Sequence, residues 1–402
     1  MFVGRSLESQ KLEKHLQQTQ AGRPVNFLLT GERGIGKTSL LSYLKYIAKE
    51  GSDPTEQNLS FLVIETDLDE KVDQLGLARK IELGIRHELA QTEKTRQFMV
   101  EAWKFLQRVE FSGFSLRPNQ QTDENLLIEE FAHSLAATVN RITSPRPDDP
   151  FSTPYDGMLL LIDEADNCGD ALRLGSFLKL LLERIQRKGC NRLMVGLAGL
   201  PRLRQILVDS HPSSLRLFEE LPLDRLQDNE VENIIDIYIR IGNRENAKDT
   251  VITAPAKRML VELSEGFPHF IQQFGYSALQ ADTDGIIDER DVQSGAFGPR
   301  GALDVIGDRY YRSDFYNKIQ EESYREVLRI MADRQDEWVT KKEIRQQFDG
   351  KETTLDNALH ALRERHMIIS REGHRGIYRL QHRGFAMWIK LQAKTRDVAK
   401  HG

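Results

Sequence analysis

Residues 31–38 read Gly-Glu-Arg-Gly-Ile-Gly-Lys-Thr, and they lie between a short apolar run and a helical pattern. The run at residues 25–30 (Val-Asn-Phe-Leu-Leu-Thr) predicts a buried strand, and residues 39–49 continue as a helix. A strand, a glycine-rich loop and a helix in this order form a P-loop, in which the backbone turns tightly and points its N–H groups at phosphate. This stretch therefore predicts an α/β fold that binds ATP.

Two side chains of the loop have defined roles in such a site. Lys37 supplies positive charge to the β- and γ-phosphates, and the Thr38 hydroxyl is a ligand of Mg²⁺. ATP and Mg²⁺ are therefore the predicted cofactors. The nucleotide-binding residues predicted from this stretch are Gly31, Glu32, Arg33, Gly34, Ile35, Gly36, Lys37, Thr38 and Ser39.

A second apolar run, at residues 158–162, is followed directly by Asp163 and Glu164. A strand here would place both carboxylates at the edge of the sheet beside the P-loop. Asp163 would then hold Mg²⁺, and Glu164 would polarise the attacking water as the catalytic residue. An acidic pair is common at strand ends, but its combination with the P-loop predicts an ATPase.

Further apolar runs at residues 61–64 and 193–197 alternate with helical patterns, which predicts a parallel sheet covered on both faces. A long insertion at residues 70–150 separates the second strand from the third. It contains two helical patterns, and an alternating stretch at 109–116 between them predicts a small hairpin. After Leu223 the pattern is helical to about residue 295.

Four segments together resemble the AAA+ ATPases of the origin-recognition and cell-division-cycle initiator type. They are residues 2–5 (Phe-Val-Gly-Arg), the P-loop, residues 161–164 and residues 196–201 (Gly-Leu-Ala-Gly-Leu-Pro). The chain is also similar to STAND signalling ATPases and to transposition ATPases, and the resemblance covers about residues 1–290. The resemblance implies that the N-terminal segment lines an adenine pocket. The alternative is that this segment is a plain turn before a helix. The pocket residues implied are Val3, Gly4 and Arg5.

The same resemblance implies an arginine that reaches the γ-phosphate of a neighbouring subunit, and therefore a homo-oligomer. Residues 213–218 (Ser-Ser-Leu-Arg-Leu-Phe) lie at the corresponding place in the sequence, with Arg216 as the candidate catalytic arginine. Arg202 and Arg204 are rival candidates. The alternative for each of them is an ordinary surface arginine.

Two segments depart from the family pattern. The fourth strand ends in Ala198-Gly199, where many AAA+ proteins carry a polar residue that senses the γ-phosphate. Residues 266–269 (Gly-Phe-Pro-His) stand where initiators often place an arginine, and they resemble the STAND pattern more closely. His269 is either a phosphate contact or a structural histidine. Both departures predict a slow nucleotide-controlled switch rather than a motor.

The C-terminal region predicts three helices and a hairpin, which together resemble a winged helix. Residues 323–332 are amphipathic, a capping box at 340–343 opens a second helix, and a third begins at Thr353 or Thr354. Two β-like runs within residues 367–380 flank a glycine-rich turn. A winged helix reads DNA with its third helix and its wing. The predicted DNA-binding residues are Arg363, Arg365, Arg371, His374, Arg375 and Arg379.

Charge is distributed unevenly along the 402 residues. Residues 340–402 contain fourteen basic and seven acidic side chains, a net charge of +7, which leaves −12 on residues 1–339. A basic tail on an acidic body favours a double-stranded DNA partner, with a solvated basic face as the alternative. No apolar run reaches the length of about 18 residues that spans a membrane, and no signal peptide is evident, so the predicted location is cytoplasmic.

These patterns predict an ATP-binding, slowly hydrolysing AAA+ switch that engages DNA as an oligomer. Two alternatives stay open: a STAND-type regulator whose winged helix docks a partner protein, and an ATPase that delivers a transposase or a defence effector to DNA. The predicted fold is α/β, with a parallel-sheet P-loop AAA+ core, a helical lid and a C-terminal winged helix. The predicted domains are the core at 1–222 with the insertion at 70–150, the lid at 223–295, a linker at 296–318 and the winged helix at 319–402.

Overall fold

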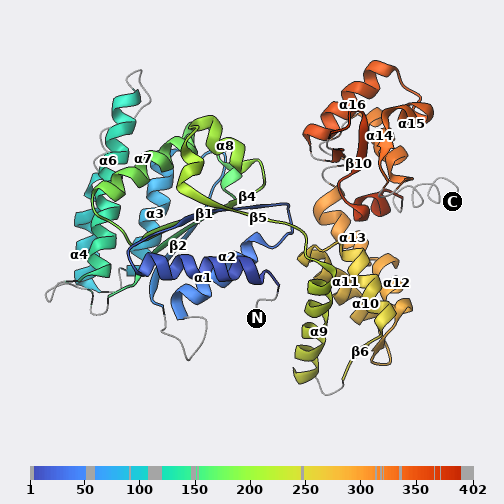
Figure 1. Cartoon of the computed structure of the whole chain (residues 1–402), viewed down its shortest axis with the longest axis horizontal. Coiled ribbons are helices and arrows are strands. Elements are labelled where there is room, and N and C mark those ends of the chain that lie inside the picture. Colours follow the sequence, from blue (N-terminus) through green and yellow to red (C-terminus); the bar gives the residue numbers. More distant parts are fainter. Residues whose placement is uncertain are drawn as a thin grey trace. The chain divides into compact units, whose positions relative to one another are not determined.

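The computed structural model divides the chain into two compact units, Met1–Asp224 and Arg225–Gly402 (Figure 1). Within the described part of the chain, no helix is long and apolar enough to cross a membrane. The structure describes residues 4–50, 59–89, 92–106, 120–145, 151, 154–245, 249–312, 315–316, 319, 321–334, 337–365, 367–371 and 373–390.

The first unit is built on a five-stranded parallel sheet in the order β2-β3-β4-β1-β5. Strands β3 and β4 are buried along nearly their whole length, because helices cover both faces of the sheet. The predicted parallel α/β sheet is therefore confirmed. The strands are β1 (Asn26–Gly31), β2 (Phe61–Asp67), β3 (Gly157–Asp163), β4 (Leu193–Gly199) and β5 (Phe218–Leu223).

The sequence pattern does not predict strand β5. Its sequence, Phe-Glu-Glu-Leu-Pro-Leu, buries Phe218, Leu221 and Leu223 and exposes the other three residues. β5 is an edge strand that pairs only with β1, so one side of its backbone needs no ladder partner and Pro222 is tolerated there. The two glutamates and the proline interrupt the apolar run by which the four other strands are predicted.

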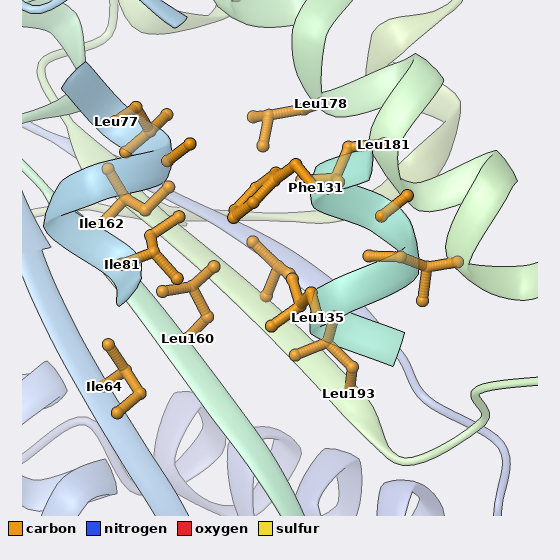
Figure 2. Close-up of a cluster of buried hydrophobic side chains, with 14 of the residues drawn as sticks. Ile64, Leu77, Ile81, Phe131, Leu135, Leu160, Ile162, Leu178, Leu181 and Leu193 are labelled. Atoms are coloured by element: carbon orange, nitrogen blue, oxygen red, sulfur yellow. The ribbon is translucent and has the colours of Figure 1, made fainter. Parts of the chain in front are cut away.

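Helices of the insertion complete the main hydrophobic core. Figure 2 shows Ile64, Leu160 and Ile162 of the sheet facing Leu77 of α3 and Phe131 of α6. The insertion is therefore part of the core of the first unit; its predicted hairpin at 109–116 lies outside the described residues. The helices of this unit are α1 (Ser6–Gln20), α2 (Lys37–Glu50), α3 (Gln74–Leu89), α4 (Glu93–Ala102), α6 (Gln120–Thr143), α7 (Leu174–Arg187) and α8 (Leu203–Ser210).

The second unit begins with helices and a two-stranded parallel sheet, β6-β7, and ends in a small module of helices with an antiparallel sheet in the order β8-β10-β9. Thr340 and Glu343 form the predicted capping box. The hairpin of β9 and β10 confirms the winged-helix architecture. The elements are α9 (Asp228–Glu245), β6 (Val251–Ile252), α10 (Ala254–Ser264), α11 (Pro268–Ala281), β7 (Ile286–Ile287), α12 (Glu289–Phe297), α13 (Ala302–Ile306), the π-helical η4 (Gly307–Tyr311), α14 (Glu322–Ala332), β8 (Val339–Thr340), α15 (Lys341–Gln347), α16 (Glu352–Glu364), β9 (Ile368–Ser370) and β10 (Ile377–Leu380).

The segment at 296–318, expected as a linker, contains packed secondary structure. Helix α13 and η4 bury Leu303, Ile306 and Tyr311. Gly307 lies so close to Trp388 that a Cβ atom on it would be 2.0 Å from the indole nitrogen. The glycines and proline that suggest a linker occupy a turn between helices, and the apolar residues after them belong to a core.

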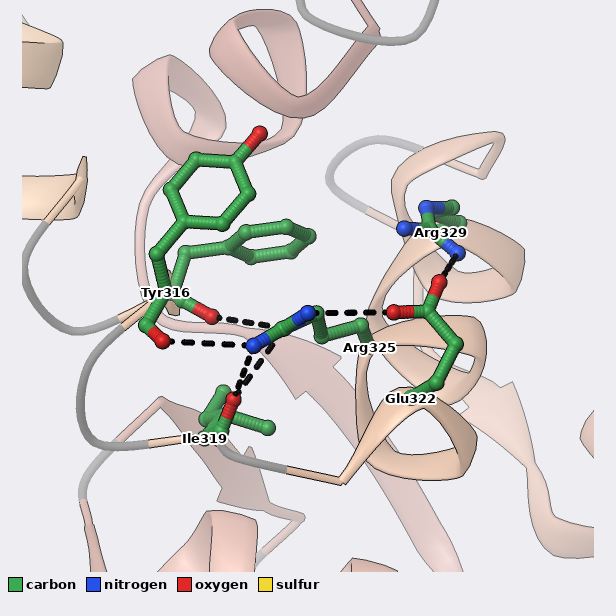
Figure 3. A network of polar contacts seen from close by, with 6 residues as sticks. Tyr316, Ile319, Glu322, Arg325 and Arg329 are labelled. Carbon is green, nitrogen blue, oxygen red and sulfur yellow. Dashed lines mark hydrogen bonds and ion pairs between the residues drawn. The ribbon is translucent and has the colours of Figure 1, made fainter.

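Arg325 of α14 fixes the chain that enters the winged-helix module (Figure 3). Its guanidinium donates to the carbonyl oxygens of Phe315, Tyr316 and Ile319 at 2.7–3.2 Å, and it forms an ion pair with Glu322. A single side chain thus satisfies three main-chain carbonyl groups of an irregular segment. Its loss would leave these carbonyl groups without that hydrogen-bond donor.

We expect Arg325→Met to destabilise the second unit by about 2 kcal/mol, because three carbonyl groups lose a charged donor. This corresponds to a fall in melting temperature of about 4–8 °C, measured by circular dichroism. Arg329→Met is the matched control, since the described contacts of Arg329 are an exposed ion pair with Glu322 and a ring contact. Equal melting temperatures for the two variants would show that the network does not hold this segment.

Candidate nucleotide site

The P-loop leaves the sheet at Gly31 and re-enters regular structure at Lys37, the first residue of α2. Gly34 and Gly36 have φ angles of 80° and 99°, which an L side chain adopts only with strain. A Cβ atom on Gly31 would lie 3.0 Å from the carbonyl oxygen of Leu223, so this glycine permits close packing on β5. The predicted glycines therefore have distinct physical roles in forming a tight anion-binding loop.

Lys37 lies inside the loop rather than in open solvent. Its ammonium group donates to the carbonyl oxygens of Gly31 at 2.8 Å and Glu32 at 3.0 Å. Burial lowers the Lys37 pKa, and the nearby carboxylates of Asp166 and then Asp163 act in the opposite direction. The site thus holds a positive charge where phosphate oxygens would be received.

Thr38 and Asp163 meet at the carboxyl edge of the sheet. The Thr38 hydroxyl donates to one oxygen of Asp163 at 2.8 Å, although 125 residues separate them in sequence. Hydroxyl and carboxylate oxygens are the hard ligands that Mg²⁺ prefers, so this pair fits the predicted ion. When bound, Mg²⁺ would neutralise part of the phosphate charge.

Glu164 occupies a strained turn directly after β3. Its φ and ψ angles are 48° and 33°, a left-handed conformation that is uncommon for a residue other than glycine. Its backbone N–H donates to Asp163 at 2.8 Å, and its exposed carboxylate accepts a hydrogen bond from Asn167 at 3.1 Å. The turn therefore presents the Glu164 carboxylate directly after Asp163, and its catalytic role stays a prediction.

The N-terminal segment packs on the P-loop through Arg5. Both Gly4 and Arg5 are left-handed, and the buried Arg5 side chain donates to the carbonyl oxygen of Ile35 at 3.2 Å. Val3 lies outside the described residues. Arg5 thus anchors the segment expected to line the adenine pocket, while Arg33 and Ser39 are exposed at the rim of the loop.

Residues 1–195 match the family model described as AAA ATPase domain. This part of the chain is an AAA ATPase domain. Its activity is ATP hydrolysis, so the prediction of an ATPase is confirmed. No curated protein matches the chain in sequence.

Two solved structures are similar in fold over almost the entire chain. The Walker-type ATPase of Pyrococcus abyssi is 18% identical with a TM-score of 0.53, and the match covers 97% of this chain and 96% of that one. The ORC2 protein of Aeropyrum pernix, in ADPNP–ADP complexes, is 15% identical with a TM-score of 0.53, covering 98% and 95%. At these identities the similarity shows the fold alone.

The three candidate catalytic arginines, which lie in the first unit beyond residue 195, have different surroundings. Arg202 forms an ion pair with the buried Asp166 at 2.9 Å, at the same sheet edge as the P-loop. Arg204 forms an exposed ion pair with Glu220 at 3.1 Å. Arg216 is exposed in the short helix η3 (Ser214–Leu217), just before β5.

His269 belongs to the second unit, near the start of α11. Its ring packs against Tyr310, with the ring centroids 5.2 Å apart, and both burial and the charge of Arg309 lower its pKa. His269 is therefore neutral at neutral pH. A neutral, aromatic-packed imidazole fits the structural alternative for this residue better than a phosphate contact does.

The predicted DNA-binding residues occupy the end of α16 and the β9–β10 hairpin. Arg371 and Arg379 lie over the same indole ring, Trp338, with guanidinium carbons 5.9 Å and 4.9 Å from its centroid. The sequence pattern did not identify Trp338, because it precedes the first strand of the hairpin by thirty residues. The remaining predicted residues are exposed: Arg363, Arg365, His374 and Arg375.

We expect Lys37→Ala to weaken ATP binding about 100-fold or more, because the loop loses its charged phosphate ligand. Isothermal titration calorimetry measures the affinity directly. Lys45→Ala, on the same helix, removes only a surface ion pair with Glu65 and should leave the affinity unchanged. An unaltered affinity in the Lys37 variant would place the nucleotide elsewhere.

Proposed function

We propose that this chain is a slow, nucleotide-controlled AAA+ switch that acts as a homo-oligomer and engages double-stranded DNA through its winged-helix module. The Thr38–Asp163–Glu164 arrangement supports the nucleotide chemistry, in which Glu164 accepts a proton from the attacking water. Slow turnover follows from the end of β4, where Gly199 offers no side chain to a phosphate.

The single observation that carries the DNA-binding role is the shared contact of Arg371 and Arg379 with Trp338. Cation–π contact restricts both long side chains before any ligand arrives, so less conformational entropy is lost on binding phosphate. Arg375 lies exposed beside them on the turn of the hairpin. Three arginines on one hairpin form a compact cationic surface suited to a DNA backbone.

Ion pairs reduce the repulsion expected from the acidic residues of the third helix. Lys341 contacts both Glu352 and Asp356 of α16 at 2.6 Å, and Arg345 contacts Glu352 at 3.2 Å. These carboxylates already have cationic partners. The electrostatic repulsion between α16 and a phosphate is therefore weaker than the sequence of α16 suggests. This supports DNA over the protein-docking alternative.

The sheet geometry supports contact of Arg216 with a γ-phosphate bound by a neighbouring subunit, not with one bound by its own chain. Phe218 at the start of β5 pairs with Asn26, whereas Leu223 at its end pairs with Gly31 of the P-loop. A strand of this length spans about 20 Å, so Arg216 lies at the edge of the sheet opposite the P-loop of its own chain. If Arg216 contacts a γ-phosphate, that phosphate is bound by another copy.

We expect ATP hydrolysis per subunit to rise with protein concentration, and Arg216→Ala to lower it by about 100-fold or more while ATP affinity is kept. The measurements are a concentration series of the ATPase rate and the sedimentation of the protein with ATP. Arg204→Ala is the matched control. A rate per subunit that is independent of concentration in the parent would contradict the role in trans.

We expect Arg371→Ala/Arg375→Ala to weaken binding to two unrelated duplexes similarly, and to lower the salt slope of binding by roughly two units. Fluorescence anisotropy at several salt concentrations measures both quantities. Trp338 provides a second readout, because the other two tryptophans, Trp103 and Trp388, are buried.

The matched control for the wing is Arg244→Ala/Arg258→Ala, which removes the same charge from exposed positions outside the winged-helix module. It should bind both duplexes like the parent. If the wing variant also binds like the parent, the wing is not the DNA contact. If the parent binds no duplex with or without ATP, the protein-docking regulator becomes the better proposal.

A further inference from the structure

A continuous series of polar contacts leads from the end of β4 to Glu164. Asp166 is buried, with 6% of its surface exposed. Its two carboxylate oxygens accept from the backbone N–H of Leu200 and from Nε of Arg202, both at 2.9 Å. The outer nitrogen Nη2 of Arg202 donates to Oδ1 of Asn167 at 3.4 Å, and Nδ2 of Asn167 donates to Oε2 of Glu164 at 3.1 Å.

The charges at the two ends determine the orientation of the Asn167 amide. Its oxygen faces the guanidinium of Arg202, and its NH₂ group faces the carboxylate of Glu164, so both contacts are favourable. A flipped amide would place its oxygen against the carboxylate and its NH₂ group against the guanidinium. Arg202 therefore sets the amide orientation, and the amide in turn holds one oxygen of Glu164.

Gly199 explains why no polar side chain ends β4. A Cβ atom on Gly199 would lie 2.6 Å from Oδ1 of Asp166 and 2.9 Å from the side chain of Leu203. Asp166 therefore occupies the space that a polar residue at position 199 would need. β4 lies next to β3 in the sheet, so Arg202, which follows β4, reaches Asp166 and Asn167 in the turn after β3.

We propose that Asn167 and Arg202 are positioning residues for Glu164, and that together they hold one oxygen of its carboxylate in place. The inference rests on the proposed role of Glu164 as the general base. Asn167 binds only Oε2 and leaves Oε1 available to the attacking water. With its backbone held in the left-handed turn and one oxygen fixed, the carboxylate samples few orientations, which favours proton transfer.

The test separates positioning from nucleotide binding. Asn167→Ala is expected to lower kcat about tenfold while KM, the affinities for ATP and ADP, and the melting temperature stay within about twofold or 2 °C of the parent. Calorimetry and thermal unfolding provide the readouts that do not depend on turnover. A variant that raises KM with kcat unchanged would overturn the inference, because Asn167 would then act on binding.

Arg202→Lys tests the other end of the series. A lysine keeps a positive charge beside Asp166, but its single ammonium group does not reproduce the fork that contacts Asp166 and Asn167 together. We expect the same fall in kcat as for Asn167→Ala, and the double variant should be no slower than either single variant, because both act through one contact series. Multiplicative effects would overturn the inference.

Two further variants make the result interpretable. Arg96→Lys, on α4 and paired with Glu93, should retain the parental kcat. Glu164→Gln should abolish measurable turnover while keeping ATP affinity. If Glu164→Gln hydrolyses ATP at the parental rate, the proposed base and this inference both fail. If it is inactive and Asn167→Ala turns over like the parent, only the positioning role fails.

Discussion

The nucleotide site depends on the hydrogen bond between Thr38 and Asp163. That hydrogen bond depends in turn on the order of the strands in the sheet. Thr38 lies beyond the end of β1 and Asp163 is the last residue of β3, and these two strands do not pair with each other because β4 lies between them. Since all three strands are parallel, their carboxyl ends meet at one edge, where the P-loop, Asp163 and the contacts of Asp166 come together. The site therefore forms because parallel strands end at the same edge of the sheet.

Features whose chemistry is local could be predicted from the sequence, and features that depend on distant partners could not. The P-loop requires glycines and a lysine at fixed spacing, so its backbone and its function are visible in the same eight residues. The Asn167–Arg202 contact joins residues 35 positions apart, and no local pattern indicates it. β5 was missed because Glu219, Glu220 and Pro222 obscure an edge strand, and Trp338 because its arginine partners lie on another element.

The packed segment at 296–318 changes how the second unit is understood. A flexible linker would let the winged helix move independently of the preceding helices. Instead, Arg225 forms an ion pair with Glu265 at 3.2 Å and donates to the carbonyl of Gln381 at 3.1 Å, while Glu265 accepts from the backbone of Gly384 at 2.8 Å. Together with the contact of Gly307 and Trp388, these bonds join the helical region to the winged helix. The helical region and the winged helix are therefore in direct contact rather than separated by a free linker.

The distribution of charge is consistent with DNA contact confined to the winged helix. Residues 1–339 carry a net charge of −12, which would repel a polyanion if charges acted over the whole molecule. At physiological ionic strength, however, the screening length is about 8 Å, so a phosphate responds to its immediate surroundings. At the hairpin those surroundings are Arg371, Arg375 and Arg379, two of which are held against Trp338. Under the proposed function, the net negative charge of residues 1–339 makes the remainder of the chain on average a poorer surface for DNA than the hairpin.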